Sequence, residues 1–197
     1  MESARRAEPP PYLVVDTSAF IAALIPDVGQ HSEYADFLER CALAGTVLAY
    51  CEIVELELAE AAIRIDLKRR HGRKANAARR DGRMLGPARA FAISVREAFA
   101  ELLSGFDTIR IPMSQTIPTL DNEDYPQSTT LTQAAVGLTE RFGLGSYDAV
   151  HVVCAMVASA PVLARDVGFA RMAGLTLITD TTRTLAARRL RRNSGPA

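Results

Sequence analysis

Apolar and polar residues alternate along the chain in blocks that predict strands followed by helices. The run YLVV (12–15) is short and continuously apolar, which is typical of a strand buried on both faces of a sheet. Residues 33–44 then carry apolar side chains at helical spacing. Further strands are predicted over TVLAY (46–50), FDTIRI (106–111), PVLA (161–164) and LTLIT (175–179). Strands that alternate with helices over the whole chain predict an α/β fold with a central parallel sheet of about five strands.

The longest helical pattern follows the second strand, over residues 52–70. It consists of strong helix formers, and Gly72 is expected to end it. Other helices are predicted over 18–25, from Pro87 to about 103, over 131–142, within 143–160 and briefly over 166–174. Residues 113–128 are expected to form an irregular excursion loop. The apolar stripe of the long helix is predicted to comprise Ile53, Leu56, Ala59, Ile63 and Leu67.

These elements predict one domain over residues 12–182. A helical, basic segment and an acidic loop, at about 64–130, are interpreted as insertions into it. Residues 1–11 are expected to be disordered, because their PPP run has no amide hydrogens to donate. Residues 183–197 are expected to form a basic C-terminal tail, either a helix or a frayed end.

Composition excludes several classes of protein. The 197 residues contain 23 basic and 23 acidic side chains, so bulk charge does not favour nucleic-acid binding. Three scattered cysteines without a CxxC pair argue against a disulfide framework or a thiolate zinc site. The N-terminus lacks the apolar core of a secretory signal, and no apolar run is long enough for a membrane span. We therefore expect a cytoplasmic protein.

The informative chemistry is a set of acids near strand ends. Asp16 follows the first strand, Asp166 follows PVLA, and Asp148 opens an apolar helix. Ligands bind beyond the carboxyl ends of the strands in an open parallel sheet, where apolar surroundings make an uncompensated carboxylate costly. A divalent cation with oxygen ligands would supply the missing charge. Helix capping by Asp16 or Ser18, and stabilisation of a helix dipole by Asp148, are the structural alternatives.

Four motifs in this order, VVDTSAFI (14–21), CEIVELEL (51–58), YDAVHVVCA (147–155) and ARDVGF (164–169), resemble the PIN domain, especially the VapC-type toxin ribonucleases. The resemblance runs from residue 12 to 179, with a poor match between about 64 and 139. It implies a three-layer α/β/α fold. It also implies four catalytic, metal-binding acids: Asp16, Glu57, Asp148 and Asp166. Glu55 lies about 200° from Glu57 around a helix, so both cannot serve one centre.

The resemblance implies an endoribonuclease that uses Mg²⁺ or Mn²⁺, in which Ser18 and Thr17 orient the ligands. It further implies the toxin role in a type II toxin–antitoxin system, with RNA as substrate, an antitoxin partner and a homodimer. Ala164 stands where the family often has Ser or Thr, and Gly168 stands where it sometimes has another acid. These departures leave open a PIN-like scaffold that binds RNA or protein without cutting. Transfer through a phosphorylated Asp16 is a weaker alternative, since Ser18 stands where that chemistry uses a second Asp.

Two local features add candidates. Residues 68–83 contain eight Lys or Arg and one Asp, so Arg69, Arg70, Arg73 and Lys74 are possible RNA-binding residues, although a solvated helix face explains them equally. His151 lies three residues after Asp148 and on the same helix face, where it is either a core histidine or a neighbour of the acids.

Overall fold

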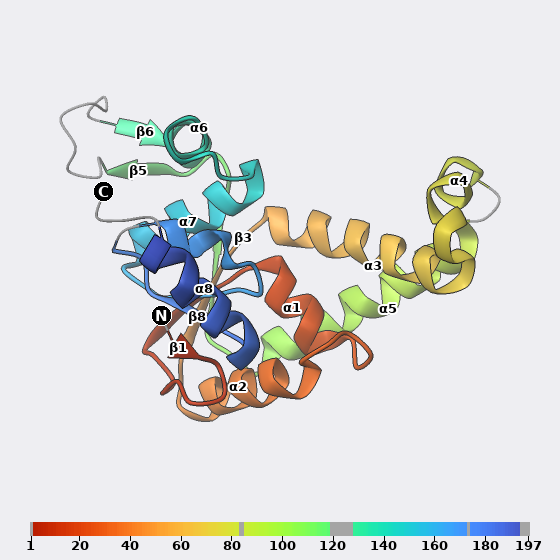
Figure 1. The fold of residues 1–197 in the computed structure, drawn as a ribbon, viewed down its shortest axis with the longest axis horizontal. Helices are drawn as coiled ribbons and strands as arrows, with labels where there is room; N and C mark the ends of the chain where they lie inside the picture. Colours follow the sequence, from red (N-terminus) through yellow and green to blue (C-terminus); the bar gives the residue numbers. More distant parts are fainter. Residues whose placement is uncertain (1, 83–84, 119–127, 173, 194–197) are drawn as a thin grey trace.

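The structure is a computed structural model that describes residues 2–82, 85–118, 128–172 and 174–193. One sheet of six parallel strands, in the order β1-β8-β7-β2-β3-β4, forms its centre (Figure 1). The predicted parallel α/β architecture is therefore confirmed, with one strand more than expected. The strands are β1 (Glu2–Ser3), β2 (Tyr12–Val15), β3 (Val47–Cys51), β4 (Thr108–Ile111), β7 (Val162–Leu163) and β8 (Leu177–Thr179).

Alternate residues of the central strands face two separate cores, which gives the three layers. Val14 and Ala49 pack with the apolar side of α7 (Ser146–Ala158) on one face of the sheet. Leu13 and Leu48 pack with α1 (Thr17–Leu24) and α2 (His31–Leu43) on the other. Strands buried on both faces explain why these segments read as unbroken apolar runs.

Residues 2–11 are ordered, which corrects the prediction of disorder over residues 1–11 for the part that the structure describes. β1 pairs with β8 at the edge of the sheet, and the Ala4 amide donates to the Thr179 carbonyl at 2.7 Å. Ala4 and Ala7 are buried, and the Arg40 guanidinium donates to both of their carbonyl groups. The PPP run does not prevent this, because the pairing residues come before it.

A helical arm extends from the body of the molecule. It consists of the C-terminal half of α3 (Ile53–His71), η1 (Gly72–Lys74), α4 (Ala75–Arg80) and the N-terminal half of α5 (Leu85–Ser104). α3 and α5 pack against each other, and α4 lies at the far end (Figure 1). The strand predicted over 106–111 lies between the predicted basic and acidic insertions and is the sheet strand β4.

The predicted apolar stripe of α3 is largely wrong. Its buried apolar residues are Val54, Leu58, Ala61, Ala62 and Leu67, whereas Leu56 is 61% exposed. Apolar residues occur around much of this helix, so the local pattern does not select one face. The packing of α3 against α1 and α5 selects it instead.

The remaining elements flank the sheet. Residues 113–128, predicted as an irregular loop, contain one strand of an antiparallel pair, β5 (Thr116–Pro118) with β6 (Ser128–Thr130); residues 119–127 lie outside the described part. α6 (Leu131–Phe142) begins at a capping box formed by Thr130 and Gln133. The predicted short helix after PVLA is the 3₁₀ helix η3 (Val167–Arg171).

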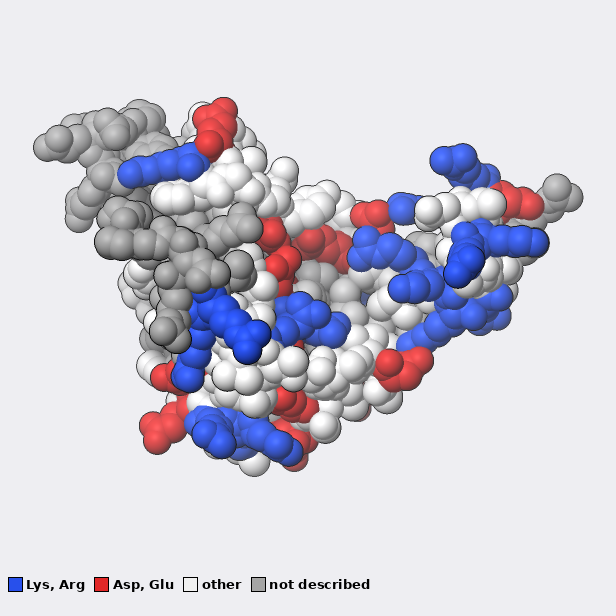
Figure 2. Space-filling view, in the orientation of Figure 1, with Lys and Arg blue, Asp and Glu red and all other residues white. Residues whose placement is uncertain are grey.

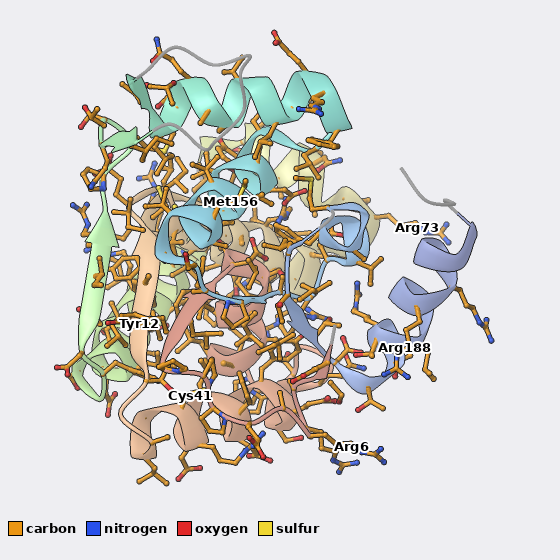
Figure 3. All side chains as sticks on the ribbon, turned by 90° about the vertical axis from the view of Figure 1, so that its left-hand side faces the viewer. Arg6, Tyr12, Cys41, Arg73, Met156 and Arg188 are labelled. Carbon is orange, nitrogen blue, oxygen red and sulfur yellow. The ribbon has the colours of Figure 1, made fainter. Side chains whose placement is uncertain are left out.

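The basic C-terminal segment is helical where it is described. α8 (Thr181–Asn193) begins within the range assigned to the domain and packs on η3, β1 and β8. It lies at one edge of the molecule, where Arg188 points outward (Figure 3). The three cysteines are buried and free. No helix in the described residues is long and apolar enough to cross a membrane.

Candidate active site

The order of the strands places the candidate acids together. β2 and β7 are neighbours in the sheet, but the chain continues from β2 to β3 and β4 on one side and from β7 to β8 on the other, so the strand order reverses between β2 and β7. Such a reversal opens a crevice at the carboxyl ends of the strands. Asp16 directly follows β2, and Asp166 follows β7 by three residues. α3, which carries Glu57, begins after β3.

All four predicted acids line one pocket of about 220 Å³ at this crevice. Asp16, Glu57, Asp148 and Asp166 come from four separate segments, and the predicted supporting residues Thr17 and Ser18 line the same pocket. Figure 2 shows acidic side chains on the floor of the hollow between the body and the helical arm. The rest of the lining was not predicted: Ile21, Glu60, Ala61, Arg64 and Tyr147.

Asp16 both caps a helix and faces the pocket, so the two interpretations of this residue are compatible. Its Oδ2 accepts from the backbone amide of Ser18 at 2.9 Å, as an N-cap of α1, and also from the Ser18 hydroxyl. The Ser18 hydroxyl oxygen in turn accepts from the Arg165 amide at 3.0 Å. This chain of contacts ties α1 to the segment after β7 and fixes the Asp16 carboxylate.

Glu57, rather than Glu55, points toward the acids. The Thr17 hydroxyl donates to Glu57 Oε2, and the Glu57 side chain is 18% exposed. Glu55 lies on another side of α3, where Arg110 Nε donates to it at 3.0 Å outside the pocket. Helical geometry therefore separates the two glutamates, as the spacing predicted.

His151 lies beneath the acids and joins two of them. It is fully buried, and its Nε2 is 3.3 Å from both Asp16 Oδ1 and Glu57 Oε2. Burial by itself lowers the pKa of His151, but the hydrogen bond to Glu57 and the charges of Asp16 and Glu57 outweigh it, so the net direction is upward. The sequence left its role open between core and site, and the structure shows that His151 occupies both.

Mutual repulsion is visible at Asp148. Burial, followed by the negative charges of Asp16 and Asp166, raises the pKa of its carboxyl group from 3.8 to about 6. Two glycines leave room for the acids: a Cβ on Gly145 would lie 3.1 Å from Asp148 Oδ2, and one on Gly168 would lie 3.2 Å from Asp166 Oδ1. The Gly168 amide also donates to Asp166 at 2.7 Å. The glycine at 168, a departure from the family pattern, therefore contacts the Asp166 carboxylate directly.

The donor set suits a hard divalent cation. It consists of carboxylate oxygens that repel one another. Among the described residues, the basic side chains beside these oxygens are His151, which lies between Asp16 and Glu57, and Arg64, which lines the pocket. In their present positions, however, no three His, Cys, Asp or Glu side chains of the described chain are arranged to hold a metal ion. Asp16 is turned toward Ser18 and Glu57 toward Thr17. Asp16, Glu57, Asp148 and Asp166 could hold Mg²⁺ or Mn²⁺ after side-chain rotation.

The four basic residues predicted to contact RNA differ in their surroundings. Arg69 pairs with Asp27 and lies over the Phe91 ring, 5.0 Å from its centre. Arg70 Nε bonds both carboxylate oxygens of the buried Asp66. Arg73 and Lys74 are exposed on η1. Arg69 and Arg70 are thus engaged within the protein, whereas Arg64, which the sequence reading did not single out, lines the pocket. Arg64 follows Glu57 by seven residues, which places both on one side of a helix, so the spacing was a signal that the sequence contained.

Comparisons with known proteins give weak structural similarity. No family model matches the chain, and no curated protein matches it. A chain of VapBC2 from Rickettsia felis, crystallised with a DNA fragment from its promoter, is 16% identical, with 84% of this chain and 96% of that chain covered and a TM-score of 0.48. PAE2754 from Pyrobaculum aerophilum is 17% identical, with 90% of each chain covered and a TM-score of 0.45.

Proposed function

We propose that this protein is a metal-dependent endoribonuclease of the PIN type, the toxin of a toxin–antitoxin pair. The observation that carries the proposal is the convergence of Asp16, Glu57, Asp148 and Asp166 on one pocket. Their motifs lie far apart in the sequence, and four functionally unrelated acids are not expected to meet in a crevice where burial and then their charges raise the pKa of Asp148.

The chemistry that bound Mg²⁺ or Mn²⁺ supplies to phosphodiester hydrolysis is a more acidic water and a positive charge beside the phosphate oxygens. The protein's own residues hold the ligands in place. Ser18 and the α1 backbone orient Asp16, and Thr17 orients Glu57. The His151 imidazole holds the Asp16 and Glu57 carboxylates near each other, because its Nε2 lies 3.3 Å from an oxygen of each. No protein side chain is needed as general base in this scheme.

A non-cutting PIN-like scaffold is the second candidate. The observation in its favour is that the acids are turned toward Ser18 and Thr17, with no group of three ready to hold a cation in the described chain. In that case the pocket would be a binding site for RNA or protein without hydrolysis. The antitoxin partner, the homodimer and the cytoplasmic location remain predictions from the sequence.

The test is cleavage of a panel of end-labelled, single-stranded and looped RNAs with Mn²⁺, with Mg²⁺ and with EDTA. Wild-type protein should cut only with metal, leaving 5′-phosphate ends, and Asp16→Asn should lose at least about 100-fold in rate, because even changes behind metal ligands cost 10- to 100-fold. Equal residual activity in the two proteins would eliminate the nuclease and leave the scaffold. Glu55→Gln, outside the pocket, is the matched control for loss of a carboxylate.

A further inference from the structure

We infer that one face of α3, from Glu57 along the helical arm to Lys68, is the surface on which the backbone of single-stranded RNA lies as it leaves the acidic pocket. The surface comprises Arg64 and Lys68, with Arg79 beside it. This inference rests on the proposed nuclease function, and it replaces Arg69 and Arg70 as the basic residues that face the substrate.

Helix geometry aligns the cations with the pocket. Arg64 and Lys68 follow Glu57 by seven and eleven residues, so each lies within about 20° of the direction of Glu57 around α3. They stand about 10 Å and about 16 Å farther along the axis. Arg64 lines the pocket itself. A strand whose phosphate lies at the acids would therefore pass these two side chains in order. Figure 2 shows basic side chains on the arm next to the acidic hollow.

The cations on this face are free to bind a phosphate, unlike their neighbours. Within the described chain, neither Arg64 nor Lys68 forms an ion pair, and both are exposed. Arg69 and Arg70 lie about 120° and 220° around the helix from Glu57 and bond Asp27 and Asp66. Removing Arg70 would leave a buried carboxylate without its partner, so its role is structural.

Arg79 supplies a third positive charge from α4. Its guanidinium bonds Glu60, a pocket-lining residue, at 2.8 Å, and both side chains are about half exposed. An ion pair this exposed contributes about 1 kcal/mol or less, so a phosphate can compete with Glu60 for Arg79. The arm therefore offsets the repulsion that the carboxylates exert on a polyanion. α3 carries no Phe, Tyr or Trp on which a base could stack, which favours contact with the backbone.

The experiment measures binding separately from cleavage. A fluorescein-labelled single-stranded RNA that spans pocket and arm is titrated with Asp16→Asn protein, and fluorescence anisotropy is recorded at several NaCl concentrations. The double variant Arg64→Gln/Lys68→Gln, in the same background, should lower the slope of log K against log salt by about 1.4. Each lost phosphate contact lowers the slope by about 0.7, so the loss of two contacts should weaken binding about 25-fold at 0.1 M salt.

The matched control is Arg188→Gln/Arg189→Gln, which removes the same charge from exposed positions of α8. It should leave slope and affinity within twofold of the parent. Equal losses in both double variants would show non-specific attraction and overturn the inference, as would unchanged binding in the α3 variant. Loss of binding to poly-glutamate with RNA binding intact would also overturn it, assigning the surface to an acidic protein. If wild-type protein fails to cut RNA while the α3 variant still loses RNA binding, the nuclease proposal falls and the binding surface stands.

Discussion

Replacing Asp148 by asparagine should stabilise the metal-free protein, although it removes a proposed metal ligand. Burial and the neighbouring acids raise the pKa of Asp148 from 3.8 to about 6, so the folded state holds its proton more tightly than the unfolded state. The stability from this proton is fully present below about pH 4 and is lost as pH rises through about 6. The gap corresponds to about 3 kcal/mol, and partial solvent access reduces it to about 2 kcal/mol.

The assay is urea unfolding in EDTA at pH 8 and at pH 4, comparing wild type with Asp148→Asn. At pH 8 the variant should be more stable by about 2 kcal/mol, a midpoint shift of roughly 1 M urea. At pH 4 the two should be equal, since a protonated carboxyl and an amide are both neutral. Saturating Mn²⁺ should then raise the stability of wild type more than that of the variant.

Asp36→Asn is the control, because Asp36 is an exposed acid on α2 outside the pocket. It should change the stability at pH 8 by no more than about 0.5 kcal/mol. If Asp148→Asn is no more stable than wild type at pH 8, the claim that ionised Asp148 destabilises the metal-free protein is refuted. A gain of equal size at pH 4 would refute its electrostatic cause.

Three further outcomes are expected. Glu57→Gln should reduce metal-dependent RNA cleavage at least about 100-fold, whereas Glu55→Gln should stay within threefold; similar rates in initial-velocity assays would contradict the assignment of α3's inner face. His151→Leu should lower the free energy of unfolding at pH 7 in EDTA by about 1–3 kcal/mol, because two partly buried carboxylates lose their shared donor; unchanged urea midpoints would contradict the bridge. Gly145→Ala should weaken Mn²⁺ binding in calorimetry because its Cβ would crowd Asp148, while Gly86→Ala, with open space around it, should not; equal affinities would show that Asp148 moves freely.

Continuous apolar runs were enough to locate most of the sheet. Five of its six strands overlap segments predicted from the sequence; β2, β3, β7 and β8 are mostly buried and leave an apolar signal, whereas β4 is an exposed edge strand. β1 was missed because Glu2 and Ser3 carry no such signal. Its position depends on hydrogen bonds offered by the edge of β8, which come from the far end of the chain.

The candidate site was likewise predicted only in part from the sequence. Local motifs single out Asp16, Glu57, Asp148 and Asp166, and the spacing on one helix separates Glu57 from Glu55. That these acids share one pocket, and that His151 bridges two of them, depends on contacts between residues as far as 147 positions apart. No local pattern contains that information.

For the basic segment, local sequence was enough to predict that α3 is a helix, that it ends at Gly72 and that it carries many cations. Helical spacing places Arg64 and Lys68 in line with Glu57, and only the tertiary structure decides that the side of α3 with Glu57 and Arg64 lines the pocket. Apolar residues lie around much of α3, so the face that packs on α1 and α5 is chosen by the fit between helices. Once that face is buried, Glu57 and Arg64 line the pocket, and Arg69 pairs with Asp27 from a distant part of the chain, whereas the Arg70–Asp66 pair lies within α3 itself.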